Sequence, residues 1–337
     1  MSTIYTWVPS PDHKYPNHPE APGRLTELET RLPSFHAERL EATPATRDEI
    51  ARVHSTHMID LLAMSCEMGP EIIDHAPTYV TQLSFRDALL ASGGTLSCVR
   101  QVWAGEAANA FAIIRPPGHH AEPERAMGFC LFNNIAIAAR DLLERGAARV
   151  LVVDYDAHHG NGTQAAFWSN ERLAYLSTHQ WGIYPGSGRM DDAPHAKGRI
   201  VNAPLPAYAG DACFSQITDQ LVAPFIRSFQ PEMILVSAGF DSHWDDPITS
   251  LGLSSAGFYA ISNRLVELAN EHCKGKIVFV LEGGYSPRNV ANGSSAVFTA
   301  LTGETFIDPG DRSPHKEPDI TQMVDAICKW HRFRESS

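Results

Sequence analysis

The sequence predicts an α/β fold in which a central, mostly parallel sheet is covered by helices on both faces. Short apolar, β-branched runs alternate with helical patterns along the chain, and this alternation is typical of parallel strands joined by helices. Polar clusters follow the apolar runs. Because ligands of such sheets bind beyond the carboxyl ends of the strands, we expect one functional site at that edge.

Five apolar runs are predicted to form buried strands of this sheet. Each run is almost entirely apolar, as expected of strands that are covered on both faces. They lie at residues 111–114, 150–153, 173–176, 233–236 and 277–281.

Two helices are predicted between these strands. Residues 133–145 (NNIAIAARDLLER) carry apolar side chains at helical spacing and stop at Gly146, a residue that commonly ends helices. The segment SSAGFYAISNRLVELANEHC begins at Ser254, whose hydroxyl can cap a helix, and is followed by Gly275.

Length and composition indicate one domain over residues 1–337. The chain has 337 residues with 43% hydrophobic content, and we find no linker, repeat or low-complexity tract that would divide it. No apolar stretch approaches the roughly 20 residues of a membrane span, and the N-terminus lacks a signal-peptide layout, so we expect a cytoplasmic protein with no membrane contact. The six cysteines lack C-x-x-C spacing, which favours buried thiols over a thiolate metal site or disulfides.

The net charge argues against direct binding to nucleic acid. The chain carries 27 Lys and Arg against 39 Asp and Glu, a formal charge of −12, which would repel a phosphate backbone. The acidity could favour basic substrates, although many proteins are equally acidic for solubility alone.

The cluster DYDAHHGNG (154–162), which follows the second apolar run, contains a candidate metal site. In an extended segment the side chains of Asp154, Asp156 and His158 share one face. Asp156 and His158 could bind one divalent cation, and Asp241 of AGFDSHWDD, after the fourth run, could supply a third ligand. Three protein ligands leave a coordination position open, as in catalytic zinc sites. The alternative is that the two aspartates cap a following helix and His158 is a surface residue with its hydrogen bonds satisfied.

The clusters RPPGHH (115–120) and EGGY (282–285) supply candidate catalytic groups. Beside a metal, neutral histidines such as His119 and His120 can take a proton from water and return it to a leaving amine. Asp154 is a natural hydrogen-bond partner for one of them and Asn161 for the other. Tyr285 follows two glycines and could stabilise an oxyanion. Taken alone, the histidines fit a simple turn and the tyrosine fits packing.

These motifs resemble those of the histone deacetylase superfamily, in the class II-like branch of bacterial deacetylase-like amidohydrolases and acetylpolyamine amidohydrolases. Five blocks occur in the family's order and spacing, and they span most of the chain. They are NHPEAPGRL (17–25), RPPGHHAEPERAMGFCLFNN (115–134), VDYDAHHGNGTQ (153–164), SAGFDSHWDDP (237–247) and LEGGYSP (281–287). The resemblance implies the single-domain arginase/deacetylase-like fold and zinc-dependent hydrolysis of N-acetyl-lysine or acyl-lysine amides.

The resemblance also implies a role for individual residues. Zinc would be bound by Asp156, His158 and Asp241. The catalytic residues would be His119, His120, Asp154, Asn161 and Tyr285, with His120 the main proton carrier. A structural potassium ion would be held by Asp154, Asp156, His158, Ser177 and Thr178. The substrate tunnel would involve Gly128, Phe129, Tyr184, Ile248, Gly283 and Gly284, with Arg24 near an acetate exit.

Two positions depart from parts of this family. Class I members carry aspartate where Asn161 stands, so the partner of His120 is neutral here and should raise the proton affinity of that histidine less. Relatives specialised for acetylpolyamines place a glutamate where this chain has Ile248, which argues against that route to polyamine selectivity. Asp245 and Asp246 could substitute for the missing carboxylate.

Three alternative functions remain open at the level of sequence. The first is hydrolysis of acetylpolyamines or other small acetylated amines. The second is a catalytically weak acyl-lysine binder, but such relatives carry histidine where this chain has Tyr285. The third is an arginase-like enzyme with two manganese ions, which would need an aspartate where this chain has Gly160. The physiological substrate, the preferred acyl chain and the oligomeric state are not determined, and a homo-oligomer is compatible with the sequence.

Overall fold

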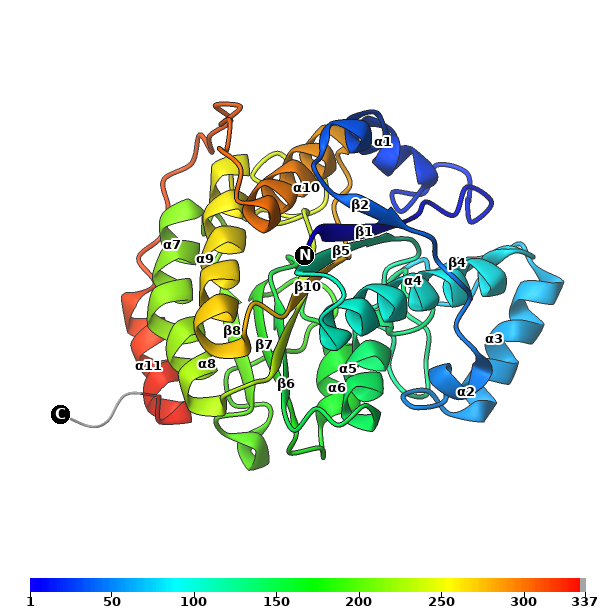
Figure 1. The fold of residues 1–337 in the computed structure, drawn as a ribbon, viewed down its shortest axis with the longest axis horizontal. Helices are drawn as coiled ribbons and strands as arrows, with labels where there is room; N and C mark the ends of the chain where they lie inside the picture. The colour runs from blue at the N-terminus through cyan, green and yellow to red at the C-terminus, as the bar shows by residue number, and fades with distance from the viewer. Residues whose placement is uncertain (334–337) are drawn as a thin grey trace.

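The computed structural model describes residues 1–333 and contains one eight-stranded sheet in which every pair of neighbouring strands is parallel (Figure 1). In spatial order its strands are β2 (Glu38–Leu40), β1 (Thr3–Val8), β5 (Asn109–Ile114), β10 (Ile277–Leu281), β9 (Met233–Ala238), β6 (Val150–Asp154), β7 (Leu173–Gln180) and β8 (Ile200–Leu205). A small antiparallel pair, β3 (Glu71–Ile72) with β4 (Tyr79–Val80), lies outside this sheet. The predicted single α/β domain with a parallel sheet is confirmed.

Helices cover both faces of the sheet (Figure 1). One face carries α2 (Arg47–Ile50), α3 (Thr56–Met68), α4 (Ser84–Ala104), α5 (Asn134–Glu144) and α6 (Asn161–Phe167). The other carries α1 (Thr26–Arg31), α7 (Asp211–Ile217), α8 (Ala223–Phe229), α9 (Ser255–Cys273), α10 (Pro287–Thr302) and α11 (Thr321–His331). Short turns of other helix types are Pro22–Leu25, Leu32–Ser34, Pro194–Ala196 and the π-helical Thr218–Val222 between α7 and α8.

The central strands divide their side chains between two hydrophobic cores. Along β10, Ile277 and Phe279 belong to the core under α9 and α10, whereas Val278 and Val280 belong to the core under α4 and α5. This alternation follows from the two-residue period of a strand. Because both sets are apolar, a strand buried on both faces appears in the sequence as a continuous apolar run.

The five predicted strands are β5, β6, β7, β9 and β10. The prediction for β10 matches at both ends, and the other strands are longer by one to four residues. The helix predicted at 133–145 is α5, which Asn133 caps by accepting a hydrogen bond from the backbone N–H of Ala136. The helix predicted after Ser254 is α9, and the Ser254 side chain caps it.

Strands β1, β2 and β8 were not predicted. They form the two margins of the sheet, where the residues are less uniformly apolar: β8 reads IVNAPL and β2 reads ERL. Only α5 and α9 were predicted among the helices; α1–α4, α6–α8, α10 and α11 were not. All six cysteines are buried thiols, as expected. Within residues 1–333 no helix is long and apolar enough to cross a membrane.

The strand order brings the polar motifs together. Strands β5, β10, β9, β6 and β7 are consecutive neighbours in the sheet. The clusters RPPGHH, EGGY, AGFDSHWDD and DYDAHHGNG lie at the ends of the first four, and β7 itself ends in the polar residues 177–180. Since all five strands run in the same direction, their carboxyl ends meet at one edge. The edge predicted to carry the functional site is therefore built by five adjacent strands.

One buried histidine, His54, supports the loop that follows β5. His54 accepts a hydrogen bond from the backbone N–H of Asn133 at 2.8 Å through Nε2, and its Nδ1 lies 3.0 Å from the carbonyl oxygen of Glu122. Both contacts are satisfied by the neutral ring. Burial lowers the pKa of His54 from 6.5 to about 4.

We predict that His54 makes the fold sensitive to mild acid. Below about pH 6.5 the unfolded chain binds a proton at His54 that the folded chain does not bind until about pH 4, so the free energy of unfolding falls as the pH drops through this window. The contribution lost is up to roughly 3 kcal/mol. Urea unfolding at pH 7, 6 and 5 measures the slope, and His54→Gln should flatten it while lowering stability at pH 7. An unchanged slope in the variant would contradict this assignment.

Candidate active site

A cluster of three buried side chains lies where β6 and β9 end. The Nδ1 atom of His158 is 3.2 Å from Oδ1 of Asp156 and 3.0 Å from Oδ2 of Asp241. The potential ligand atoms of the three residues all lie within 4.8 Å of one another, and the three residues are buried. The sequence predicted this set as metal ligands, and the fold brings it together from two adjacent strands.

Backbone N–H groups orient both carboxylates of this cluster. Ala157 donates to Oδ1 of Asp241, and Gly283 donates to Oδ2 of Asp156, both at 2.9 Å. The remaining oxygens, Oδ1 of Asp156 and Oδ2 of Asp241, are those that face His158. Ligands fixed in this way by surrounding hydrogen bonds are characteristic of metal sites. One nitrogen and two carboxylate oxygens with space for a further ligand fit a zinc ion.

Glycines allow the backbone to approach these carboxylates closely. A Cβ on Gly283 would lie 2.5 Å from Oδ2 of Asp241 and 2.7 Å from Oδ2 of Asp156. A Cβ on Gly160 would lie 2.5 Å from Oδ2 of Asp154 and would also collide with the hydroxyl of Tyr175. The backbone here therefore leaves no room for the aspartate that a second, arginase-like metal would need at position 160.

Electrostatic interactions within the cluster are strong because water is excluded. Burial by itself lowers the pKa of His158, but Asp156 and Asp241 outweigh burial and raise it to about 10. Burial and the charge of Asp156 raise the pKa of Asp241, whereas His119 and His158 outweigh burial and lower the pKa of Asp156. Two buried carboxylates this close require compensating positive charge, which a divalent cation would supply.

The ring of His119 lies between two carboxylates, those of Asp154 and Asp156. Its Nδ1 lies 3.1 Å from Oδ2 of Asp154, as predicted, and the same oxygen accepts a hydrogen bond from the Tyr175 hydroxyl at 2.9 Å. Burial lowers the pKa of His119, but Asp156 and Asp154 outweigh it and raise the pKa to about 10. The environment therefore favours the protonated form of His119.

His120 has the opposite environment. Its Nδ1 lies 2.8 Å from Oδ1 of Asn161, the partner predicted for it. Burial, His119 and His158 lower the pKa of His120 well below its usual value, and the hydrogen bond to Asn161 offsets only part of this effect. The surroundings thus raise the pKa of His119 and lower that of its neighbour His120. Opposite pKa shifts of two nearby groups commonly distinguish a charged residue from a proton acceptor.

Tyr285 stands beside the metal cluster in a loop fixed by two charged side chains. Its backbone N–H donates to Oδ2 of Asp246 at 2.9 Å, and the guanidinium of Arg24 lies 5.7 Å from the centre of its ring. Arg24 also donates to the carbonyl oxygens of Gly284, at 2.8 Å, and of Glu282. Burial and the charges of Asp241 and Asp156 raise the pKa of Tyr285 well above its ordinary value. The phenol therefore remains a hydrogen-bond donor.

A largely apolar pocket of about 230 Å³ opens above the cluster. Its wall includes Phe129, whose ring packs edge-on against Tyr285, and Tyr184, whose ring packs edge-on against His120. The full lining is Ala76, Pro77, His120, Gly128, Phe129, His158, Tyr184, Ile248 and Tyr285. Four of the predicted tunnel residues are in this wall. Gly283 and Gly284 are not, because Gly283 lies behind the two carboxylates and Gly284 faces Arg24.

The loop that carries Phe129 has an unusual backbone conformation. Gly128 and Phe129 have φ angles of 58° and 67°, in the left-handed region that a phenylalanine rarely adopts. Asp74 and Thr78 accept hydrogen bonds from their N–H groups at 3.3 and 2.9 Å. A Cβ at position 128 would lie 2.5 Å from the His120 ring. Glycine at 128 therefore lets the phenylalanine reach the pocket without displacing the histidine.

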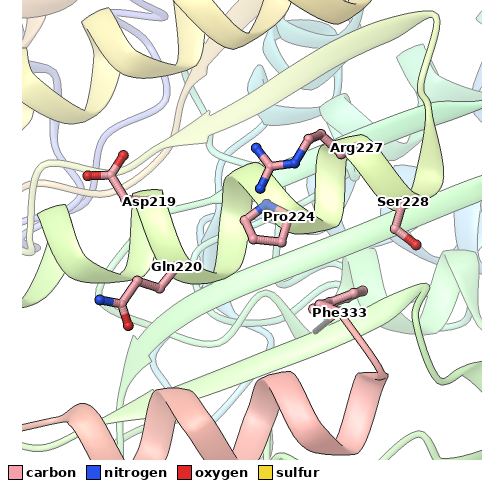
Figure 2. Close-up of a pocket in the computed structure, with 6 residues that line it drawn as sticks. All are labelled: Asp219, Gln220, Pro224, Arg227, Ser228 and Phe333. Carbon is pink, nitrogen blue, oxygen red and sulfur yellow. The ribbon is translucent and has the colours of Figure 1, made fainter. Parts of the chain in front are cut away.

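A larger pocket of about 500 Å³ lies elsewhere, between the π-helical segment with α8 and the residue Phe333 (Figure 2). It is lined by Asp219, Gln220, Pro224, Arg227, Ser228 and Phe333. Among residues 1–333, the one group of His, Cys, Asp and Glu side chains with metal-binding geometry is the cluster of Asp156, His158 and Asp241. The smaller pocket is therefore the candidate active site.

The residues predicted to hold potassium lie side by side at the ends of β6 and β7. Asp154 and Ser177 are register partners in the sheet, and Thr178 donates its hydroxyl to the carbonyl oxygen of Asp154 at 3.2 Å. The backbone N–H of Asp156 donates to Oδ1 of Asp154 at 3.1 Å. The Ser177 hydroxyl contacts His179. Binding of potassium here stays a prediction.

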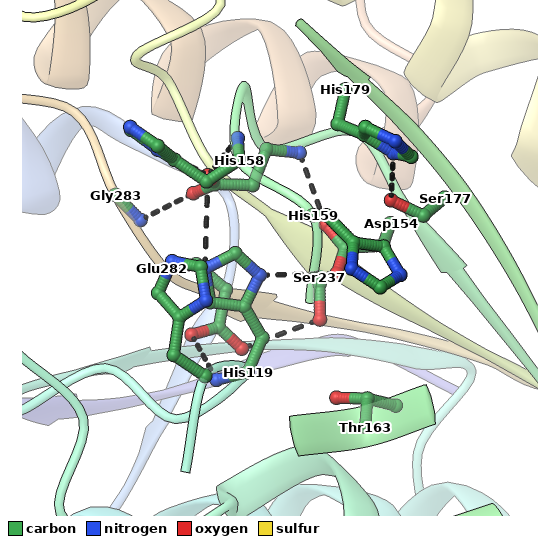
Figure 3. Close-up of polar contacts among 12 residues, drawn as sticks. His119, Asp154, His158, His159, Thr163, Ser177, His179, Ser237, Glu282 and Gly283 are labelled. Carbon is green, nitrogen blue, oxygen red and sulfur yellow. Dashed lines mark hydrogen bonds and ion pairs between the residues drawn. The ribbon is translucent and has the colours of Figure 1, made fainter. Parts of the chain in front are cut away.

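Sequence reasoning missed Tyr175 and Glu282. The fully buried carboxylate of Glu282 accepts hydrogen bonds from the N–H groups of Gly118, at 2.7 Å, and His119, at 3.1 Å (Figure 3). It thereby holds the loop after β5 against the loop after β10. An acid directly after an apolar strand was a usable signal for Glu282. Tyr175 lies inside an apolar run, and nothing in the sequence distinguishes it from an ordinary core aromatic.

Comparison with known proteins shows the family to which the chain belongs. Residues 18–301 match the histone deacetylase domain, and the chain therefore belongs to the histone deacetylase family. Its fold matches the crystal structure of the HDA15 HD domain with a TM-score of 0.86 and 30% identity, over 98% of this chain and 94% of that one.

Curated relatives of similar length include hydrolases from several kingdoms. A probable deacetylase of Archaeoglobus fulgidus is 41% identical over 80% of this chain and 77% of its own. Histone deacetylase 10, chloroplastic, of Oryza sativa subsp. japonica is 38% identical over 97% of this chain and 80% of its own. The histone deacetylase-like amidohydrolase of Pseudomonas aeruginosa is 36% identical over 88% of this chain and 80% of its own. The chain is thus an amide-hydrolysing family member that acts on acetylated substrates.

We predict that Asp241→Asn removes the metal site without removing the fold. The change deletes one charge and one carboxylate ligand, but an amide oxygen can still accept from the N–H of Ala157. Zinc affinity, measured by titration against a chromophoric chelator, should fall by more than about a hundredfold, because even indirect partners of a ligand contribute that much. Asp245→Asn, at an exposed neighbouring carboxylate, is the matched control. Equal affinity in the two variants would refute the ligand assignment.

Proposed function

We propose that this protein is a zinc-dependent amidohydrolase that cleaves the amide of N-acetyl-lysine, or of another acyl-lysine, and releases acetate and the free amine. The observation that carries the proposal is the position of the cluster of Asp156, His158 and Asp241 at the base of an apolar pocket. His120 and Tyr285 flank that cluster in the same pocket wall.

Asp156, His158 and Asp241 would hold the zinc ion. A bound zinc ion polarises an amide carbonyl and lowers the pKa of a coordinated water, so that attack becomes feasible near neutral pH. The protein contributes the fixed directions of the ligand atoms, since backbone donors hold both carboxylates. It also contributes a site that excludes bulk water, because all three ligands are buried.

His120 is the proposed proton carrier. Its Nδ1 is occupied by the hydrogen bond to Asn161, and the neutral ring can accept a proton from the attacking water at Nε2 and return it to the departing amine. His119, whose Nδ1 lies 3.1 Å from Oδ2 of Asp154, would supply positive charge beside the reacting atoms when it is protonated, the form that this carboxylate favours.

Tyr285 is the proposed stabiliser of the developing oxyanion. Its raised pKa keeps the phenolic proton in place, and its loop is fixed by Asp246 and Arg24. A donor held in advance toward the place where negative charge develops lowers the barrier without reorganisation. This tyrosine argues against the alternative of a catalytically weak acyl-lysine binder.

The pocket favours a substrate with an apolar, linear chain beside its acetylated nitrogen. Phe129 and Tyr184 line it with aromatic surface, and Ile248 stands at its rim with 41% exposure. The methylene chain of lysine has this character. The relatives named probable deacetylase and histone deacetylase support an acetylated substrate, and the apolar pocket favours acetylated lysine among such substrates.

Acetylated polyamines are the second candidate substrates. The absence of a glutamate at position 248 argues against them, and so do the contacts of Asp246. Asp246, which could have replaced the missing glutamate, accepts hydrogen bonds from the N–H groups of Tyr285 and Ile248 at 2.9 Å each. It is buried and serves to fix the loop. Asp245 remains an exposed carboxylate near the rim.

Several further expectations are untested and stay predictions. These are the bound potassium ion, the cytoplasmic location, the lack of direct nucleic-acid binding, a homo-oligomeric state and the boundaries of the domain at residues 1–337. Two plant relatives are named chloroplastic, so relatives of this chain do not share one compartment.

Tyr285→Phe should lower kcat for an acetyl-lysine peptide by about 10²–10³-fold, the usual effect of losing one oxyanion donor. Zinc affinity and the urea midpoint should be unchanged, because the backbone contact of Tyr285 with Asp246 survives. Initial rates of acetate release give kcat. A variant that retains nearly the full rate would exclude the proposed role of the hydroxyl.

Acetate release should be faster from an acetyl-lysine peptide than from an acetylated polyamine, because Ile248 offers no charge to a distal ammonium. Ile248→Glu should then raise the polyamine-to-peptide ratio of kcat/KM by about two- to fivefold, the range for an exposed ion pair. Ile248→Gln is the neutral control of equal length. If the wild-type protein preferred the polyamine, the substrate would be a small acetylated amine and not a protein. If it hydrolysed neither substrate, the alternative of a catalytically weak acyl-lysine binder would be supported.

A further inference from the structure

Asn161 has a second set of contacts, made by the amide nitrogen and not by the oxygen that faces the His120 ring. Its amide nitrogen donates to Oε1 of Glu122 at 2.8 Å, and it also lies 3.4 Å from the sulfur of Met127 and 3.5 Å from the carbonyl oxygen of His120. A carboxylate, a thioether and a carbonyl group can only accept hydrogen bonds. The chemistry of these neighbours therefore requires the NH₂ group on this side of the amide.

The orientation of the amide determines which nitrogen of His120 carries hydrogen. With the NH₂ group directed at Glu122, the Oδ1 atom of Asn161 faces Nδ1 of His120 at 2.8 Å. An amide oxygen accepts only, so Nδ1 must be protonated and Nε2 is left with a free lone pair. The reverse orientation would place NH₂ against Nδ1 and would leave the hydrogen on Nε2, the nitrogen that must accept a proton.

We propose that Glu122 is a positioning residue that fixes the Asn161 amide and thereby holds His120 in the tautomer that can accept a proton. The proposal rests on the proposed role of His120 in hydrolysis. Glu122 acts through the Asn161 amide and does not need to touch the substrate. Asn161 stands between the Glu122 carboxylate and the His120 ring, whereas an aspartate at position 161 would place its carboxylate directly against that ring.

The loop around Glu122 is built to present this carboxylate. The backbone N–H and carbonyl of Glu122 pair with the carbonyl and N–H of Arg125 at 2.9 and 3.1 Å. The same carbonyl oxygen is 3.0 Å from Nδ1 of the buried His54. Because the backbone is fixed on both sides, the side chain reaches Asn161 from a defined position. Asn161 is itself only 8% exposed, so water offers little competition for its amide.

The first test compares two replacements of Glu122. Glu122→Met keeps a side chain of similar length but replaces the charged acceptor of the amide by a thioether, a much weaker acceptor, so the amide is held less firmly and can reverse. The value of kcat should fall about ten- to a hundredfold, the usual range for a lost hydrogen bond to a charged group. Glu122→Gln retains an acceptor oxygen and should lose much less. Zinc affinity and KM should change little in either variant. Glu124→Gln is the matched control, because that exposed carboxylate contacts Ser55 and not the amide.

The second test uses Asn161→Asp, in which both side-chain oxygens accept and no reversed orientation exists. In this background Glu122 no longer selects a tautomer and instead repels the new carboxylate. Glu122→Met should therefore lower kcat in the native background but leave it unchanged or raise it in the Asn161→Asp background. An equal fall in both backgrounds would show that Glu122 is merely structural and would overturn the proposal.

A readout independent of activity separates this inference from the proposed function. Nitrogen-15 NMR of labelled histidine reports the tautomer of His120 directly, with a His120→Gln sample for assignment. The native protein should show hydrogen on Nδ1, and Glu122→Met should show a mixture of tautomers. Unchanged spectra in the variant would refute the role of Glu122 even if the enzyme hydrolyses acetyl-lysine. Altered spectra without hydrolysis by the native protein would refute the proposed function alone.

Discussion

The close approach of two buried carboxylates, Asp156 and Asp241, is the constraint on which the rest of the site depends. Two negative charges in a water-excluded environment are unfavourable unless positive charge lies between or beside them. His158 faces both at 3.2 Å or less, and a cation would complete the compensation. The same constraint explains Gly283, whose backbone N–H can reach Asp156 because no side chain stands between them.

The parallel sheet satisfies this constraint by gathering polar residues from distant parts of the chain. Strands β6 and β9 are direct neighbours, and they place Asp156 and Asp241 side by side although many residues separate them in sequence. Glu282, after β10, then binds the backbone of Gly118 and His119, after β5. The carboxylate that follows β10 thus fixes the loop that follows β5 and carries His119 and His120.

The two histidines illustrate how surroundings assign different tasks to identical side chains. His119 lies between Asp154 and Asp156, which favour its charged form, whereas His120 faces a neutral amide. Near a bound cation a second positive charge would be costly, so a neutral His120 suits a residue that must accept a proton. Asn161 separates the negative charge of Glu122 from the His120 ring.

The sequence by itself determined the class of fold, the five central strands and the three potential metal ligands. These features are local: a strand buried on both faces is a continuous apolar run, and the ligands directly follow such runs. Only the tertiary structure decided which side chains support them. Tyr175 looks like a core aromatic, and Glu122 looks like a loop acid, until the fold places them against Asp154 and Asn161. The outer strands β1, β2 and β8 were also not predicted from the sequence. They are less uniformly apolar than the central strands, and such strands are defined mainly by the neighbours with which they pair.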